Sequence, residues 1–287
     1  MPGYRFCRTD DVPLLVRAEN LCCAPHVPGE PPFTVESFKT GVRDLNLWAS
    51  SCMVAMEGDD PLGVVLAAKR EAEGQTLIYR IGVRPGSQRR GHGRHLLKSL
   101  SSKLSILGPP RLVAEIPADR NDLRGFFEAS GYVPEVEFAD YAREAPPAAA
   151  PSPDHLAVPV TLEELKEAGA LRDDPSLSWE RSPATLANRA PRLEGIGFAS
   201  AERGFEAWVL SRPLPEGGGR EVAALGCAGD GQAQALLGIL VLHIASRSPR
   251  LVVPRVSESE VEGGQLEAWG FRKTRSYVRY AAQAAAA

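Results

Sequence analysis

The chain has 287 residues, of which 44% are hydrophobic, so it suits two globular domains rather than one large core. Its 33 basic and 36 acidic side chains leave a net charge of −3, which argues against general affinity for nucleic acid. The longest nearly apolar stretch, 235–245, is too short to span a bilayer, and the first eleven residues lack the apolar run of a signal peptide. We therefore expect a cytoplasmic protein with neither a membrane nor nucleic acid as partner.

The first half is predicted to run as strand, helix, helix, three strands, helix, strand, helix and strand. Strands are expected at 4–8, 51–57, 62–70, 77–83, 111–116 and 136–141, and helices at 12–20, from 35 onward, at 94–107 and at 122–130. Asp10 or Asp11 can cap the first helix, and Thr34 with Ser37 indicates the start of the second. Gly131 is a typical residue to end the last helix. This order predicts an α/β domain with a mixed sheet.

A proline-rich segment at 145–153 lacks any periodicity and is predicted to be an extended linker. The sequence on its two sides repeats. Arg-Leu-Val at 111–113 recurs at 250–252, and Glu-Ala-x-Gly-aromatic at 128–132 recurs at 267–271, each 139 positions later. We therefore predict a duplicated domain, with a first copy at 1–145, a linker at 146–155 and a second copy at 156–287.

The second half shows fewer local signals than the first. Strands are predicted at 156–160, 206–210, 222–225 and 251–254, and a flexible turn at 216–219. Thr161 and Glu164 are spaced as a capping box that begins a helix. Trp208 and Trp269 are predicted to be core residues.

The five cysteines are odd in number and include no C-x-x-C pair. This pattern supports neither a disulfide framework nor a zinc site. We expect buried or incidental thiols, and no metal, from these positions: Cys7, Cys22, Cys23, Cys52 and Cys227.

The most informative segment is Gln-Arg-Arg-Gly-His-Gly at 88–93, between the strand at 77–83 and the helix at 94–107. A glycine turn at a helix start leaves backbone N–H groups free to bind phosphate, and the helix dipole favours an anion there. No Asp or Glu occurs from Gly74 to Ala114, while eight basic residues do: Arg80, Arg84, Arg89, Arg90, Arg94, Lys98, Lys103 and Arg111. The segment therefore predicts a site for a diphosphate-bearing cofactor.

These residues carry a resemblance to a known family. Gln88-x-x-Gly91-x-Gly93 after a strand ending in Val83 resembles the acetyl-CoA motif Q/R-x-x-G-x-G/A of the GNAT superfamily of N-acetyltransferases. The string Phe-Phe-Glu-x-x-Gly-Tyr at 126–132 is similar to a later helix of that family. The resemblance is good over 4–143 and weaker over 156–280. It implies two tandem GNAT-like domains.

The resemblance also implies where the cofactor binds. In the family, strand backbone at positions like Ile81 and Val83 pairs with the pantetheine arm of acetyl-CoA, although both side chains also suit core packing. Backbone amides of the turn hold the pyrophosphate, and arginines can add contacts to it. The implied cofactor-binding residues are Ile81, Gly82, Val83, Gln88, Arg89, Arg90, Gly91, His92, Gly93, Arg94, Asn121 and Phe127. For His92 and His95 we expect a phosphate or solvent contact rather than catalysis.

The catalytic groups are less well marked. Many family members have a tyrosine acid where this chain has Phe127, and some have a carboxylate base where it has Leu77. Tyr79 is the nearest ionisable group on that strand, so it is our candidate catalytic residue, with core packing as the alternative. Other candidates for the base are His26, Glu30 and Glu137.

In the second half, the turn that matches 88–93 reads Ala-Gly-Asp-Gly-Gln-Ala at 228–233. It lacks the arginines and the leading glutamine, and Asp230 would repel a phosphate. We therefore expect the second copy to be degenerate and to bind acetyl-CoA poorly or not at all.

The resemblance implies acetyl transfer from acetyl-CoA to a primary amine, with a small molecule or a peptide as acceptor and a homodimer as one possible assembly. A non-catalytic acyl-CoA-binding or regulatory module is the alternative that the missing tyrosine and carboxylate favour. A nucleotide-binding protein is a third, although no G-x-x-x-x-G-K-[ST] occurs.

Overall fold

The structure is a computed structural model that describes residues 2–27, 29–144, 157–171, 174–202, 204–214, 217–229 and 231–285. The predicted linker at 146–155, Glu216 of the predicted turn and Asp230 lie outside these described residues. The chain divides into two compact units. Unit 1 comprises Met1–Ile116, Arg120–Glu135 and Arg279–Ala287, and unit 2 comprises Pro117–Asp119 and Val136–Val278.

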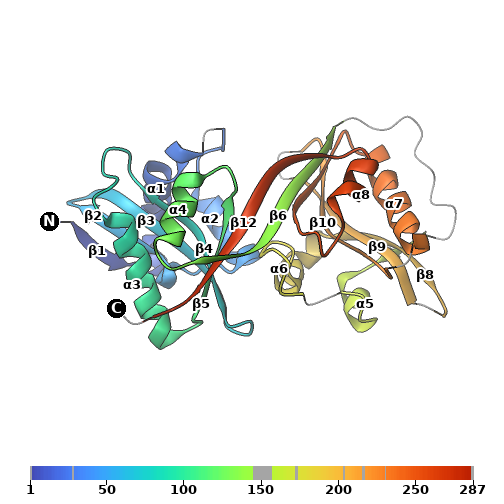
Figure 1. The fold of residues 1–287 in the computed structure, drawn as a ribbon, viewed down its shortest axis with the longest axis horizontal. Coiled ribbons are helices and arrows are strands. Elements are labelled where there is room, and N and C mark those ends of the chain that lie inside the picture. Colours follow the sequence, from blue (N-terminus) through green and yellow to red (C-terminus); the bar gives the residue numbers. More distant parts are fainter. Residues whose placement is uncertain are drawn as a thin grey trace. The chain divides into compact units, whose positions relative to one another are not determined.

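The predicted order of helices and strands in the first half is confirmed (Figure 1). Its strands are β1 (Gly3–Phe6), β2 (Met53–Glu57), β3 (Asp60–Arg70), β4 (Gln75–Val83), β5 (Arg111–Pro117) and β6 (Val133–Glu144). Its helices are α1 (Val12–Cys22), α2 (Val35–Leu45), α3 (His92–Leu107) and α4 (Asn121–Glu128), with 3₁₀ helices η1 (Thr9–Asp11), η2 (Ala24–His26) and η3 (Ala49–Ser51).

The second half repeats the same order of α-helices and strands, which agrees with a duplicated domain. Its strands are β7 (Ala157–Val160), β8 (Glu194–Ser200), β9 (Gly204–Pro213), β10 (Arg220–Cys227), β11 (Arg250–Val256) and β12 (Arg272–Gln283). Its helices are α5 (Leu162–Glu167), α6 (Pro183–Arg189), α7 (Gly231–Ser246) and α8 (Gly263–Ala268), with 3₁₀ helix η4 (Ala190–Arg192). The local signals of the sequence did not predict α6 or β8.

Two of the predicted helix starts form as expected. The Thr34 hydroxyl accepts a hydrogen bond from the Ser37 backbone N–H, and Thr161 and Glu164 form a reciprocal capping box. Asp11, one of the two predicted caps, is the N-cap residue of α1, but its side chain makes no cap hydrogen bond there. Its carboxylate instead accepts a hydrogen bond from the backbone N–H of Arg8 and so closes the turn of η1.

In unit 1, strands β1 to β4 pair antiparallel in chain order, and β4 then pairs with β5 in parallel. Helices cover both faces of this sheet. A Cβ on Gly82 would meet Cys22 of α1, whereas the next side chain along β4, Val83, lies against Gly93 of α3. Since successive strand residues point to opposite faces, α1 and α3 pack on opposite faces of β4.

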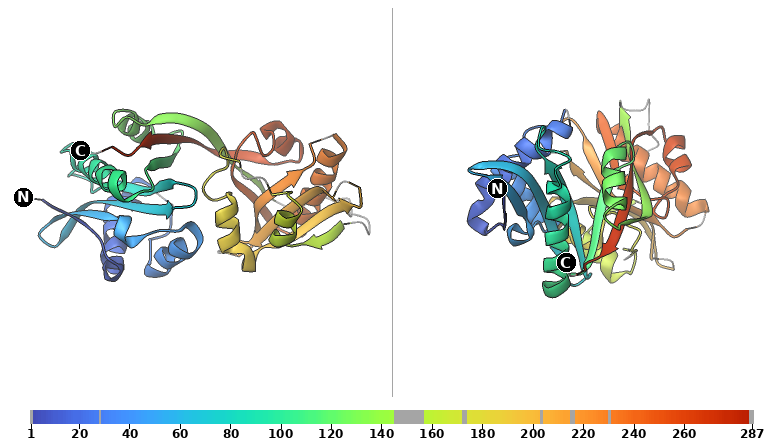
Figure 2. Two further views of the ribbon diagram at one scale, coloured as in Figure 1. Left: turned by 90° about the horizontal axis from the view of Figure 1, so that it is seen from below. Right: turned by 60° about the vertical axis from the view of Figure 1, so that its left-hand side comes forward.

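Each compact unit is completed by a strand from the other half of the sequence. The last residues of β12, from Arg279 onward, belong to unit 1, where β12 lies beside β5. Most of β6, from Val136 onward, belongs to unit 2, where it pairs antiparallel with β11. Figure 2 shows the C-terminus beside α3, and Ala285 is held there by hydrogen bonds with Ser101. The compact units therefore differ from the division at 145 and 156 that the linker and repeat predicted.

In unit 2, β7 to β10 pair antiparallel in chain order, and β10 pairs with β11 in parallel. Trp208 and Trp269 are buried in the cores of this unit, as predicted. All five cysteines are free thiols, and four of them are buried. None of the helices in the described ranges combines the length and the apolar character that crossing a membrane requires.

Candidate functional site

Strands β4 and β5 pair over three residues only. Gln75 to Leu77 lie opposite Arg111 to Val113, and both strands continue beyond these pairs without further pairing to each other. The outer edge of β4 from Ile78 to Val83 is therefore not used in a ladder with β5. An unpaired strand edge can pair with an extended ligand, as the resemblance implies for Ile81 and Val83.

A β-bulge sits at the start of this free edge. Leu66 of β3 faces Arg80, but the next residue, Ala67, faces Ile78, so Tyr79 has no opposite residue. A bulge bends its strand and interrupts the alternation of side chains. The sequence argument that Tyr79 points opposite to its two neighbours therefore does not apply here. Tyr79 is half-buried, and its ring lies 5.6 Å from the Arg80 guanidinium.

The turn that follows β4 has the backbone that an anion site needs. Gly91 is the N-cap of α3 with φ +88°, and Arg89 also has positive φ, at +61°. Positive φ in an arginine is uncommon and indicates a constrained backbone. A Cβ added to Gly91 would meet no atom within 4 Å, so the space above this residue is open. The first N–H groups of a helix have no acceptor within the helix, so those of α3 are expected to be available to an anion beside Gly91.

Fewer basic side chains around the turn lack an ion-pair partner than the sequence indicated. Arg80 forms ion pairs with Glu19 and Glu30, and Arg111 pairs with Glu135, so both are neutralised. Four arginines remain near the turn: Arg84, Arg89, Arg90 and Arg94. None of them forms an ion pair with a carboxylate of the described residues. Three of these four are exposed, which leaves them available to phosphate oxygens.

Two histidines near the turn face the first strand instead of the ligand space. The buried His92 ring is 2.6 Å from the Tyr4 hydroxyl, and the His95 ring packs on Tyr4 with centroids 3.9 Å apart. A phosphate or solvent contact was expected for the His92 side chain, but this side chain is buried against Tyr4. An anion at the turn could therefore contact His92 through its backbone N–H and not through its ring.

The carbonyl of Val83 already has side-chain neighbours. His26 Nε2 lies 3.2 Å from this oxygen, and the Gln88 amide lies 3.5 Å from it and 3.0 Å from the same ring nitrogen. Arg120 donates to the carbonyl of His26 at 2.9 Å and so holds η2 over the end of β4. A ligand that pairs with the Val83 carbonyl would therefore meet the His26 ring and the Gln88 amide beside it.

The predicted residues of α4 lie in different environments. Asn121 is exposed at the first position of the helix. Phe127 is 2% exposed and packs edge-on against Phe126 and Tyr132 and stacks on Tyr280. It has no hydroxyl and lies in an aromatic core, so it packs the helix but offers no proton to a leaving group.

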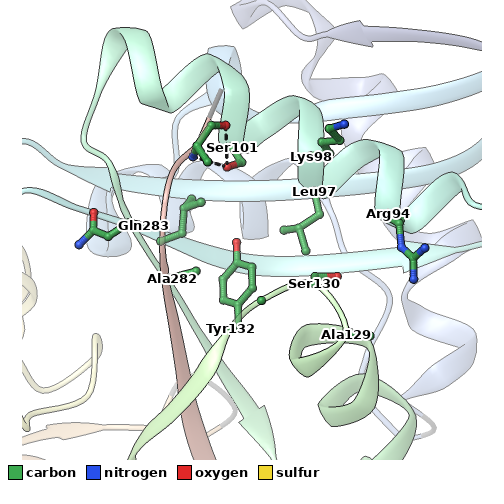
Figure 3. A pocket seen from close by; sticks show the side chains of 12 residues that line it. Arg94, Leu97, Lys98, Ser101, Ala129, Ser130, Tyr132, Ala282 and Gln283 are labelled. Carbon is green, nitrogen blue, oxygen red and sulfur yellow. Dashed lines mark hydrogen bonds between the residues drawn. The ribbon is translucent and has the colours of Figure 1, made fainter. Parts of the chain in front are cut away.

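A pocket of about 460 Å³ continues along α3 from the turn (Figure 3). Arg94 and Lys98 of α3 lie at its rim, and the Tyr132 side chain projects from below toward the helix. Burial raises the pKa of Tyr132. The other walls are mixed and include Leu97 and Leu112 together with Ser101 and Ser130.

Sequence reasoning missed one charged residue beside β4, Glu19 of α1. It is 2% exposed, and it lies with Leu15, Ala18 and Cys22 on the buried stripe of the helix. A carboxylate on an otherwise apolar stripe is the signal that could have revealed it. Of the other candidate bases, Glu30 belongs to the same cluster, whereas Glu137 lies in the part of β6 that belongs to unit 2.

Unit 2 has a similar divergence of strands, but its own arginine closes it. Strands β10 and β11 pair at Arg220 and Glu221 only. Immediately beyond, Arg181 donates hydrogen bonds to the carbonyls of Val222 in β10, at 2.9 Å, and Pro254 in β11, at 3.3 Å. Glu260 holds this guanidinium at 2.8 Å, and the arginine side chain is 1% exposed.

The comparisons with known proteins place these features in a family. Residues 17–132 match the acetyltransferase (GNAT) family. A tandem GNAT protein from the clavulanic acid biosynthesis pathway matches with TM-score 0.70 and 15% identity over 99% of both chains. A GCN5-related N-acetyltransferase from Sphaerobacter thermophilus matches with TM-score 0.68 and 14% identity over 98% of this chain and 95% of that one.

A third similar structure is the GCN5-related glucosamine N-acetyltransferase region of a fungal multi-domain GH3 β-N-acetylglucosaminidase. It has a TM-score of 0.74 and 13% identity over 98% of this chain and 38% of that chain. Residues 17–132 therefore form a GNAT domain, and the chain as a whole has the fold of tandem GNAT proteins. The predicted family and fold class are confirmed.

Proposed function

We propose that this protein transfers an acetyl group from acetyl-CoA to a primary amine, and that unit 1 alone holds the acetyl-CoA. The observation that carries the proposal is the open turn at Gly91, directly after the unpaired edge of β4. The GNAT domain match over 17–132 includes both elements. Coenzyme A has a diphosphate and a long amide-containing arm, which are the two groups that such a turn and such an edge recognise.

The fit between the chain and the cofactor can be stated residue by residue. The N–H groups from Arg89 to Arg94 would hold the diphosphate, with the arginines of this segment adding charge-assisted hydrogen bonds. Ile81 and Val83 would pair with the arm through their backbone. When bound, acetyl-CoA supplies an activated acetyl group. In the described part of the chain, no three His, Cys, Asp or Glu side chains gather as metal ligands would.

The acceptor reacts as a neutral amine, and the chain's own residues must accept the proton that its nitrogen releases as it attacks the acetyl carbonyl. Tyr79 lies at the bulge where β4 leaves β5, and it is our candidate for a group that contacts the reacting atoms. Its hydroxyl could donate a proton to the leaving thiolate, and the resulting tyrosinate could then accept the amine's proton through water. Phe127 has no hydroxyl and can do neither, which makes Tyr79 the more suitable residue of the two.

The proposal is tested by two separate measurements on the full chain. Calorimetry with acetyl-CoA tests binding, and release of free CoA thiol in the presence of primary amines tests transfer. We expect binding and amine-dependent thiol release, both reduced by changes in the turn at Gly91. Failure to bind acetyl-CoA would contradict the proposal.

One observation favours a second function, a non-catalytic acyl-CoA-binding module. Phe127 replaces the acid that the resemblance implies, and its surroundings are aromatic and dry. In this case acetyl-CoA binds with the same dependence on Gly91, but no amine accelerates thiol release. The Tyr79→Phe variant separates the two functions, because it should lower transfer only where transfer exists.

A further inference from the structure

Two carboxylates and one guanidinium meet on the α1 side of β4. Arg80 Nη2 lies 2.6 Å from Glu30 Oε2, and Arg80 Nη1 lies 3.7 Å from Glu19 Oε1. We call these three residues the Glu19–Arg80–Glu30 cluster. With both carboxylates ionised the cluster carries one net negative charge.

The place of the cluster follows from a close approach of helix and strand. A Cβ on Gly82 would lie 2.3 Å from the Cys22 carbonyl, so only glycine lets α1 sit this close to β4. Glu19 is one turn earlier in α1 and therefore lies over Arg80, two residues earlier in β4. Arg80 directly follows the bulge at Tyr79, so the cluster lies beside the proposed reaction site and on the face opposite α3.

Glu19 is unusually placed for a residue that only stabilises the fold. Its side chain is 3% exposed, and its Oε2 atom is buried without a hydrogen-bond partner among the described residues. A buried carboxylate oxygen that lacks a partner is unfavourable for folding. Burial accordingly raises the pKa of Glu19, which Arg80 opposes. A role in binding would explain why a buried carboxylate is present at position 19 although it is unfavourable for folding.

The accessible side of the cluster is Glu30. Its side chain is 42% exposed, compared with 24% for Arg80. A carboxylate accepts several hydrogen bonds, so Glu30 can keep Arg80 and still receive another cation. Both terminal nitrogens of Arg80 already lie near carboxylates, which offset its positive charge toward an acceptor's own carboxylate. The cluster therefore favours cationic groups and disfavours anionic ones.

We propose that the Glu19–Arg80–Glu30 cluster selects an acceptor with a second ammonium group, a diamine or polyamine whose non-reacting end binds at Glu30. Glu30 contacts this ammonium directly, and Glu19 supplies the buried negative charge that keeps the cluster anionic beside Arg80. This inference rests on the proposed acetyl transfer, because it identifies the class of the acceptor for that reaction.

The test compares two acceptors of equal length, 1,4-diaminobutane and butylamine, by kcat/KM of thiol release. The wild type should prefer the diamine by about tenfold, the effect of one favourable charge interaction near a protein surface. Glu19→Gln and Glu30→Gln should each remove this preference through KM, while acetyl-CoA affinity stays unchanged. Glu36→Gln, at an exposed carboxylate of α2, is the matched control and should keep the preference.

A direct binding measurement, read together with the turnover of both amines, keeps the inference separate from the proposed function. Binding of 1,4-diaminobutane to the protein with CoA is measured directly by calorimetry, which needs no turnover. Binding that depends on Glu19, without turnover, supports the inference and contradicts the transferase function. Turnover of both amines at equal efficiency supports the transferase and overturns the inference.

A structural role for Glu19 makes a different prediction about stability. If the carboxylate served only to hold Arg80, Glu19→Gln would lower the urea midpoint of unfolding and leave the diamine preference intact. That result would overturn the inference. We expect the reverse, an unchanged or higher midpoint with the preference lost.

Discussion

The hydroxyl of Tyr280 donates a hydrogen bond to the Glu128 carboxylate at 2.7 Å, although the two residues are 152 positions apart in the sequence. The Tyr280 ring also stacks on Phe127 at 6.5 Å between centroids. Next to it in β12, Arg279 pairs with the equally buried Glu115 of β5 at 3.2 Å. The end of the chain thus completes the core of unit 1 around α4.

Deletion of residues 279–287 should therefore destabilise unit 1 and abolish acetyl-CoA binding. The deletion exposes β5 and removes the partner of a buried carboxylate, a change that costs about 3–5 kcal/mol in comparable ion pairs. Urea unfolding followed by circular dichroism measures the effect. Tyr280→Phe is the matched control and should cost only about 1–3 kcal/mol, the net value of two hydrogen bonds, because the hydroxyl also accepts one from Arg124 at 3.2 Å. An unchanged midpoint after deletion would mean that β12 is dispensable.

Gly91→Asp should reduce acetyl-CoA affinity at least tenfold, or about 1.4 kcal/mol. The carboxylate would occupy the open space at the turn and repel the diphosphate. Gly91→Asn has the same shape and tolerates positive φ equally well, so the difference between the two variants isolates charge. Gly229→Asp, at φ +89° in the matching turn of unit 2, should leave affinity unchanged. Equal affinities for the Asp and Asn variants of Gly91 would place the diphosphate elsewhere.

Gly82→Ala should destabilise the protein by about 1–3 kcal/mol, the usual range for overpacking. The new Cβ would lie 2.3 Å from the Cys22 carbonyl and 2.6 Å from the Cys23 sulfur, and backbone cannot move aside at little cost. Gly125→Ala in α4 is the control, because its Cβ would meet nothing within 4 Å. We expect this second variant to be up to about 1 kcal/mol more stable than wild type in thermal unfolding.

Calorimetry should give one acetyl-CoA per chain. Arg181 already occupies the divergence of β10 and β11 with two backbone hydrogen bonds, so unit 2 has no room for the cofactor's arm at that point. Arg181→Met should destabilise the chain by about 3 kcal/mol or more, since Glu260 is then buried without its partner. A stoichiometry of two in the wild type would show that the arginine does not close the site.

The stability of the protein should depend on pH through Glu19. Its titratable or charged neighbours are Arg80 of β4, Glu30 of the loop after η2, and the thiols of Cys22 at the end of its own helix and of Cys23 just after it. Burial raises the pKa of Glu19 above its ordinary value of 4.5. The folded state therefore holds this proton more tightly, and its contribution to stability is lost as the pH rises from 4.5 through the raised pKa.

Glu19→Gln removes this titration while other carboxylates titrate as before. The free energy of unfolding of the variant minus that of the wild type should therefore increase with pH above 4.5 and stay constant below it. Urea titrations at several pH values measure this difference. A constant difference across the range would mean that the pKa of Glu19 is the same in the folded and unfolded states.

The order of helices and strands in the first half, the turn at 88–93 and the two capping boxes were all predictable from sequence. Each depends on residues a few positions apart, where glycine, hydroxyl or apolar spacing acts directly on the local backbone. The family followed from the same turn together with the helix motif at 126–132. The absence of arginines around Gly229 likewise predicted that the second turn is degenerate.

Other features required the tertiary structure, because they join residues far apart in the chain. The bulge at Tyr79 arises from pairing with β3, and no property of β4 alone reveals it. Glu19 and Arg80 meet only because Gly82 admits a helix, and Arg181 reaches Val222 only after the second sheet has formed. Local chemistry in the sequence thus predicted a phosphate site at 88–93, whereas packing between distant segments decided which strand completes each unit and which charges surround the proposed site.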